Sequence, residues 1–111
     1  MHDTRLKLPS PPYYAVIFTA QHTGADADEY GEMADKMFEL AAEQPGFLGY
    51  ENYEGDDGVG INVSYWKDET SIKAWKQVSD HKTAQAMGKA KWYQWFELRV
   101  AKVERAYSFD K

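Results

Sequence analysis

One stretch of the sequence places an asparagine, a serine and a tryptophan at alternate positions, Asn62, Ser64 and Trp66. Side chains two residues apart on a β-strand share a face, so these three would line one side of a sheet. A buried amide without a hydrogen-bond partner costs about 1–3 kcal/mol, so Asn62 must find one. That partner is either an oxygen atom of a ligand, or a buried water or neighbouring side chain.

Three further tryptophans, Trp75, Trp92 and Trp95, lie in stretches with helical periodicity, on faces that we expect to look down on the sheet. Such a stripe either fills the core or forms the wall of a cavity between helices and sheet. A cavity of that kind suits a flat polycyclic ligand held by stacking and one or two hydrogen bonds. Both interpretations are compatible with the sequence.

The histidines are three in number, His2, His22 and His81. No two of them show the spacing of a metal-binding pair, so the sequence predicts no metal site. We expect His81, two residues after Ser79, to be the histidine nearest the cavity, where it either takes part in chemistry or only helps to cap a helix. No phosphate-binding loop, nucleophile elbow or flavin fingerprint is found, so any oxidation would use the substrate's own electrons or a bound haem.

Composition excludes several other classes of protein. The 111 residues suffice for one domain, and the absence of cysteine excludes disulfides, thiolate nucleophiles and iron–sulfur clusters. A net charge of −5 argues against nucleic-acid or anionic-membrane partners. No apolar run approaches the roughly 20 residues that cross a bilayer, and Met1 to Pro12 lacks the apolar segment of a signal peptide. We therefore expect a cytoplasmic protein without membrane or nucleic-acid partners.

Turn and capping signals place the elements that would position these residues. The prolines that end near Pro12 separate a flexible arm, residues 1–12, from a domain, residues 13–111. The elements expected in the first half are a strand from Tyr13 to Gln21, a helix from a capping box at Asp26 and Glu29 to near Gln44, and strands from Phe47 to Glu54 and Val59 to Trp66 joined by the turn Gly55-Asp56-Asp57-Gly58. Those expected in the second half are a helix capped by Asp68, a helical segment that starts at Ser79 or Asp80 and runs to about Gln94, and a strand from Glu97 to Tyr107.

This β-α-β-β-α-β order predicts a ferredoxin-like α+β fold. Right-handed crossovers place the helices on one face of a four-stranded antiparallel sheet. The opposite face would then expose an apolar patch on the order of several hundred Å², which soluble monomers rarely tolerate. We therefore expect a homodimer.

Two linked segments carry a family resemblance, Pro45-Gly46-Phe47-Leu48-Gly49-Tyr50-Glu51 and the later Ser64-Tyr65-Trp66-Lys67-Asp68-Glu69, which leads to Trp75. Over roughly Tyr13 to Tyr107 the chain resembles the antibiotic biosynthesis monooxygenase family of ferredoxin-like domains. The resemblance implies that two copies pack sheet against sheet into a dimeric α+β barrel and exchange the end of the last strand.

The same resemblance implies oxygenation of a phenolic or quinol-like substrate by O₂ without a cofactor or metal. A phenolate or enolate donates an electron to O₂, and the protein supplies a dry pocket with donors that stabilise the anion. The residues that this chemistry would use are Asn62, Trp66 and His81 as catalytic groups, and Ser64, Trp75, Trp92 and Trp95 as substrate-binding groups.

A haem-degrading branch of the family gives an alternative, in which a histidine ligates the iron while an asparagine and a tryptophan flank the ring. Trp75 matches the flanking tryptophan. Gln85 stands where that branch carries its histidine, however, and the first strand contains no asparagine. A third interpretation is a domain that binds or senses a metabolite without turning it over, since membership of a family does not transmit activity.

Overall fold

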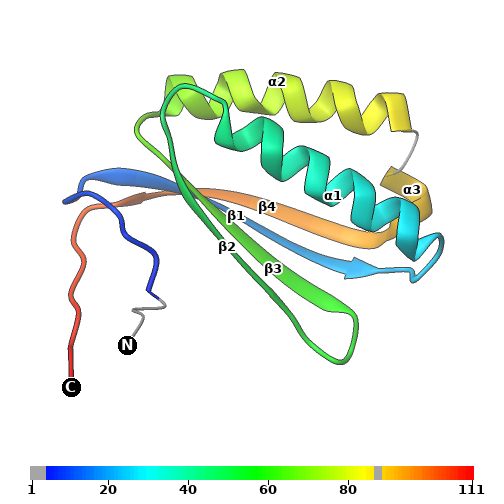
Figure 1. Cartoon of the computed structure of the whole chain (residues 1–111), viewed down its shortest axis with the longest axis horizontal. Coiled ribbons are helices and arrows are strands. Elements are labelled where there is room, and N and C mark those ends of the chain that lie inside the picture. The colour runs from blue at the N-terminus through cyan, green and yellow to red at the C-terminus, as the bar shows by residue number, and fades with distance from the viewer. Residues whose placement is uncertain (1–4, 87–88) are drawn as a thin grey trace.

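The computed structural model describes residues 5–86 and 89–111, and their side chains outside residues 83–90. The elements, in chain order, are β1 (Tyr13–His22), α1 (Ala27–Ala42), β2 (Phe47–Glu54), β3 (Val59–Trp66), α2 (Glu69–Ala86), α3 (Lys89–Trp92) and β4 (Tyr93–Val103). The strands form one antiparallel sheet in the order β2-β3-β1-β4. The helices α1 and α2 cover one face, and both ends of the described chain lie beyond the other (Figure 1). The predicted ferredoxin-like α+β fold is confirmed.

Pairing between the central strands decides which side chains meet the helices. In β1 and β3 the pairs are Val16 with Ser64, Phe18 with Asn62 and Ala20 with Gly60, so even-numbered residues of both strands share a face. That face carries the core, a buried cluster of Val16, Ala41, Trp66 and Ile72. The cluster joins both helices to the sheet.

The β2–β3 hairpin has the predicted bounds at both strands. Gly58 adopts a φ of 82°, which favours glycine, and the backbone N–H of Val59 donates to the carboxylate of Asp57 at 3.0 Å. Short polar side chains and glycine thus fold the turn locally.

Asp68 caps α2 as predicted. Its Oδ1 accepts hydrogen bonds from the backbone N–H of Ser71 at 2.8 Å and from the Ser71 hydroxyl at 2.7 Å. These bonds favour the ionised carboxylate and lower the pKa of Asp68.

The capping box predicted at Asp26 is wrong. Asp26 precedes α1 with a left-handed φ of 48°, and its side chain makes no capping hydrogen bond. The carboxylate instead lies 3.2 Å from the Nζ of Lys91, which also contacts Glu29 at 2.9 Å. An ion pair to a distant segment thus replaces the local cap.

The helical boundaries predicted after Ser79 are also wrong. The helix α2 continues without a break from Glu69 to Ala86, so His81 lies in its interior and not in a first turn. Trp95 lies on β4, opposite Gln21, although its spacing from Trp92 fits a helix. Hydrogen bonding to β1 along Tyr93–Val103 outweighs that periodicity, and the strand ends before the predicted Tyr107.

The sheet face opposite the helices carries exposed apolar side chains, among them Tyr53 at 69% and Ile61 at 44% exposure. One end of this face is covered by the chain itself, because a Cβ on Gly49 would lie only 2.9 Å from the side chain of Leu6. The described part of the arm therefore packs on its own sheet. None of the described helices has the length and apolar character needed to cross a bilayer.

Candidate active site

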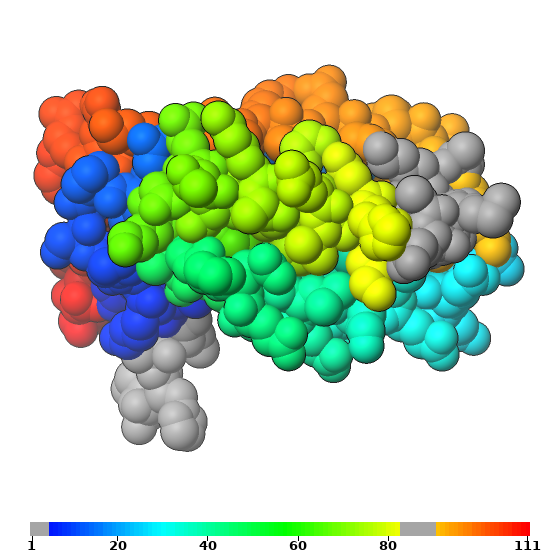
Figure 2. All heavy atoms as spheres, turned by 90° about the horizontal axis from the view of Figure 1, so that it is seen from above, coloured from blue at the N-terminus to red at the C-terminus, as the bar shows by residue number. Residues whose placement is uncertain are grey.

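A cavity of about 550 Å³ lies between the helices and the sheet. Residues of the four strands, even-numbered apart from Tyr93, line it on the sheet side, and residues of α1, α2 and α3 line it on the helix side. The helices leave β4 uncovered on the side of α2 away from α1 (Figure 2). There Phe96, Leu98 and Val100 line the cavity while remaining 38%, 48% and 48% exposed. The cavity therefore reaches the surface along β4.

One end of the cavity, the apolar end, is lined by Val16, Ala41, Ile72 and Trp75. The Trp75 ring stacks on that of Trp66, with centroids 6.0 Å apart and planes at 24°. Trp75 thus rests on Trp66 and also lines the cavity, so this end offers an aromatic surface on which a ligand could stack.

Trp66 does not line the cavity, and its predicted role as a donor to a ligand has no support from the geometry. Its side chain is fully buried at 0% exposure, and its indole N–H donates to the hydroxyl of Ser64 at 2.8 Å. Ser64, which accepts that hydrogen bond, does line the cavity. Trp66 thus orients Ser64 and supports Trp75 from behind.

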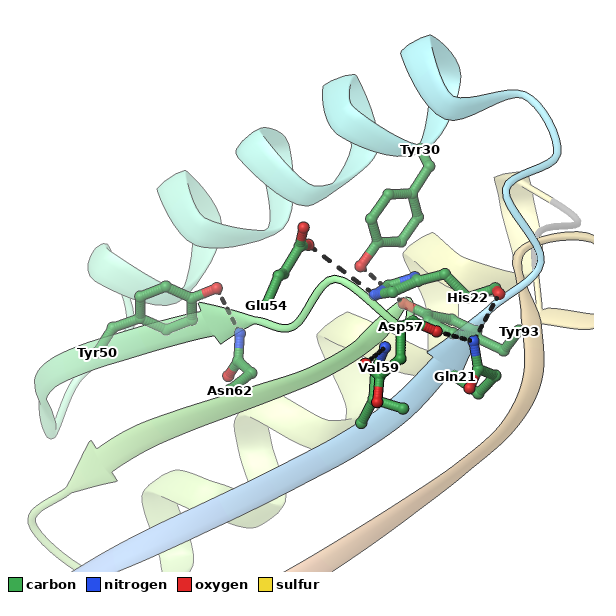
Figure 3. Close-up of polar contacts among 9 residues, drawn as sticks. All are labelled: Gln21, His22, Tyr30, Tyr50, Glu54, Asp57, Val59, Asn62 and Tyr93. Atoms are coloured by element: carbon green, nitrogen blue, oxygen red, sulfur yellow. Dashed lines mark hydrogen bonds and ion pairs between the residues drawn. The ribbon is translucent and has the colours of Figure 1, made fainter.

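Asn62 lies in the middle of the cavity floor, where its amide donates to the hydroxyl of Tyr50 (Figure 3). Burial raises the pKa of Tyr50, so this phenol stays protonated at neutral pH. The hydroxyl hydrogen of Tyr50 remains to be donated, because the bond from Asn62 uses only the oxygen. The Tyr50–Asn62 pair can therefore offer a neutral donor to a ligand oxygen.

The other end, the polar end, is formed by His22, Tyr30, Glu54 and Tyr93. Tyr30 points down from α1 toward His22, and Glu54 approaches the same ring from the end of β2 (Figure 3). The Nε2 of His22 lies 4.0 Å from a carboxylate oxygen of Glu54, and the hydroxyls of Tyr30 and Tyr93 are 3.5 Å apart. Burial is the main cause that raises the pKa of both tyrosines, so both remain phenols.

The expectation that His81 lies nearest the cavity is wrong, because His22 lines it and His81 is an exposed residue outside it. The alternation Val16, Phe18, Ala20, His22 along one strand face was the available signal. Trp95, which is 46% exposed, also lies outside the lining.

Trp92, for which the sequence left core and cavity wall open, lines the cavity and is only 3% exposed. Its ring meets that of Tyr30 edge to face, with centroids 5.6 Å apart. Within the described part of the chain, the indole N–H of Trp92 has no hydrogen-bond partner. An unpartnered buried N–H costs on the order of 1–3 kcal/mol, which an acceptor on a ligand would offset.

The haem alternative finds one of its residues in the cavity, Trp75. The side chain of Gln85 lies outside the described residues. His81, which would have to replace the missing ligand, does not line the cavity. Among the described residues no group of three His, Cys, Asp or Glu side chains is placed to hold a metal ion. The described side chains thus do not fit the set of haem-binding residues of the haem-degrading branch.

Known proteins share both the sequence and the architecture. The chain is 45% identical to YqjZ of Bacillus subtilis (strain 168) over 111 residues, which is 100% of this chain and 96% of YqjZ. It is 28% identical over 92 residues to the jasmonate monooxygenase ABM of Pyricularia oryzae, covering 81% of this chain and 43% of that protein. Among solved structures, SnoaB, a cofactor-independent oxygenase from Streptomyces nogalater, superposes with a TM-score of 0.70 at 17% identity, over 86% of this chain and 97% of SnoaB.

The family profile described as antibiotic biosynthesis monooxygenase matches residues 13–87, a range that holds β1 to β3 and all of α2. That range also contains most of the cavity floor and both long helices, α1 and α2, that cover it. The chain therefore belongs to the antibiotic biosynthesis monooxygenase family.

Proposed function

We propose that this protein is a cofactor-independent monooxygenase that acts on a small, flat, hydroxylated aromatic substrate of the quinol or anthrone type. The observation that carries the proposal is the cavity itself, which joins aromatic surface at Trp75 to neutral donors at Tyr50 and Asn62. Family membership supports the reaction type. So do the oxygenase activity named for SnoaB and the monooxygenase activity named for the Pyricularia oryzae relative.

In this mechanism the substrate lies flat along the cavity, with its rings against Trp75 and its oxygen toward the donors. Loss of a proton from the substrate gives a phenolate or enolate, which passes one electron to O₂. The resulting radical and superoxide combine to form a carbon–oxygen bond, and proton uptake gives a hydroperoxide. For an anthrone-like substrate, loss of water from this hydroperoxide yields a quinone, so one oxygen atom enters the product and the other leaves as water.

The protein contributes an environment in which charge develops at a fixed place. Donors already aimed at the developing anion stabilise it without reorganisation, and a dry cavity strengthens the interaction. Asn62, with Tyr50, is the donor pair that we assign to the anion. Trp75 and Trp92 form part of the cavity wall. Ser64, which also lines the cavity, is held in place by the hydrogen bond from Trp66.

An oxygen-uptake assay with isotope labelling tests the proposal. The chelator-treated protein is incubated with anthrone and ¹⁸O₂, without flavin, haem or metal. We expect uptake faster than in buffer and one ¹⁸O atom in each quinone molecule. Uptake no faster than in buffer over a panel of quinols and anthrones would refute catalysis of this kind. Retained binding of those compounds would then favour the domain that binds or senses a metabolite.

We also propose that the active form is a homodimer that covers the sheet face opposite the helices. Its support is the exposure of Tyr53 and Ile61 on that face. Sedimentation at low micromolar concentration should give twice the chain mass of 12.8 kDa. Ile61→Glu should shift the protein toward the monomer, whereas Lys73→Glu on the exposed side of α2 should not. A wild-type monomer at that concentration would contradict the dimer.

A further inference from the structure

We propose that His22 is the general base that removes the substrate's hydroxyl proton, and that Glu54 holds the resulting imidazolium. This inference deepens the proposed function and rests on it for the identity of the substrate. The two side chains come from the ends of β1 and β2, which run parallel to each other with β3 between them. Their ends therefore lie at the same edge of the sheet.

A glycine lets His22 reach Glu54 across the intervening strand. Gly60 of β3 pairs with Ala20 on one side and with Glu54 on the other. A Cβ on Gly60 would lie 3.2 Å from the Nε2 of His22 and 3.6 Å from the Cγ of Glu54. The imidazole thus occupies the space that any other residue at position 60 would fill.

The backbone that carries His22 is fixed from two directions. The N–H of His22 donates to the carbonyl of Gly58 in the hairpin at 3.0 Å, and the N–H of Thr23 donates to the carbonyl of Trp92 at 2.8 Å. The Thr23 hydroxyl also donates to the carbonyl of Lys91 at 2.7 Å. The ring therefore projects into the cavity from an anchored position, as a base must if it is to meet a bound substrate.

Elimination among the ionisable groups of the cavity leaves His22. The phenols of Tyr30, Tyr50 and Tyr93 stay protonated and cannot accept a proton. Asp80 is paired with Lys76 at 2.6 Å in an exposed ion pair.

The two remaining groups are His22 and Glu54. The side chain of Glu54 is 60% exposed, whereas that of His22 is 19% exposed. His22 is thus the more enclosed of the two, and imidazole is the side chain that most often serves as a general base.

The proposed step is a single proton transfer. In a quinol, or in the enol form of an anthrone, the oxygen–hydrogen bond breaks, its electron pair stays on the oxygen, and the proton binds the ring of His22. The groups that face the imidazolium are the carboxylate of Glu54, which attracts it, and the neutral hydroxyls of Tyr30 and Tyr93. Tyr30 and Tyr93 share one hydrogen bond, which leaves a hydrogen free for the new anion in addition to the donors of the Tyr50–Asn62 pair. The N–H of Trp92, which has no partner among the described residues, is a further donor at this end.

Binding of 4-nitrophenol tests the proton transfer without any turnover, because its phenolate absorbs visible light. At about one pH unit below the probe's own pKa, roughly a tenth of the free probe is ionised. We expect the wild type to bind the probe mainly as the phenolate. His22→Gln should bind it with a much smaller ionised fraction than the wild type, and His81→Gln, which changes an exposed histidine outside the cavity, should behave as the wild type.

Gly60→Ala provides a second variant that removes neither member of the pair. The added methyl group should displace the imidazole from Glu54 and lower the ionised fraction of bound probe, with circular dichroism unchanged. Glu54→Gln should lower it less than His22→Gln. Wild type that leaves the probe un-ionised or unbound, or His22→Gln that ionises it fully, would overturn the assignment.

The pH dependence of oxygen uptake separates this inference from the proposed function. In His22→Gln the value of kcat/KM should fall by about 10²-fold or more below the substrate's pKa, and the deficit should shrink toward higher pH as the substrate ionises in solution. If the wild type ionises the probe through His22 but takes up no oxygen, the assignment of His22 as the base stands and the proposed monooxygenase activity is refuted. If both the wild type and His22→Gln take up oxygen with parallel pH profiles, only the assignment of His22 as the base is refuted.

Discussion

The two ends of the cavity both contain buried tryptophans, but they differ in whether the indole N–H has a hydrogen-bond partner. At the apolar end, Trp66 and Trp75 stack and the one indole N–H of Trp66 is satisfied within the chain by Ser64. At the polar end, Trp92 is nearly as buried as Trp66, but its N–H lacks a partner among the described residues. A buried tryptophan thus stabilises the fold at the apolar end, whereas at the polar end its indole N–H is available to an acceptor on a ligand. We therefore expect stability to depend mainly on the apolar end and the proposed chemistry on the polar end.

The largest expected effect is on stability, from Trp66→Ala. Removing a fully buried indole should lower the free energy of unfolding by about 3–5 kcal/mol, as measured by urea denaturation. Trp95→Ala is the matched control, since Trp95 is 46% exposed, and it should cost about 1 kcal/mol or less. Equal losses in the two variants would remove the distinction between the apolar end and the surface.

Asn62→Ala should act on rate and much less on stability, because Asn62 lies between the two ends. Loss of one preorganised donor to a developing anion lowers kcat by roughly 10²–10³-fold. Oxygen uptake measured with saturating anthrone checks this, and urea denaturation of the same variant provides the control. A rate equal to that of the wild type would exclude Asn62 from the reaction.

A smaller effect should appear at high pH, through Tyr30. Burial, with the hydrogen bond to Tyr93, raises the pKa of Tyr30, so the folded protein keeps a proton that the unfolded chain releases near pH 10. The folded state then binds more protons, and the free energy of unfolding must fall as pH rises above about 10. Tyr30→Phe should make this decline shallower, whereas Tyr107→Phe, at an 87% exposed position, should leave it unchanged. Identical slopes in both variants would place Tyr30 in contact with solvent.

The smallest expected effect concerns haem. His81 lies outside the cavity, so titration with haemin should give no sharp Soret band that depends on it. The spectra of the wild type and His81→Ala should coincide. A stoichiometric band that disappears in His81→Ala would instead favour haem chemistry.

Local signals in the sequence were sufficient for most of the fold. The Gly-Asp-Asp-Gly turn and the Asp68 cap depend on residues close in sequence, and the structure has both. Trp95 was assigned to a helix because its spacing from Trp92 is helical, but a strand partner 74 residues away in Gln21 decides its conformation. Asp26 failed as a cap for the same reason, since Lys91 binds its carboxylate.

The site was predictable where strand alternation or helical spacing located its residues. Asn62 and Ser64 line the cavity because they alternate on a strand whose bounds the turn had fixed. The approach of His22 to Glu54 depends on the order of the strands and on the missing side chain of Gly60 between them. No spacing along the chain encodes that approach, so it becomes visible only in three dimensions.

The uncovered edge at β4 has a consequence for ligand exchange. Phe96, Leu98 and Val100 serve both as cavity wall and as protein surface. Anything that packs along this edge would therefore close the cavity at the same time. The residence time of a bound molecule would then depend on how often that cover separates from β4, so release could be slow even where intrinsic affinity is modest.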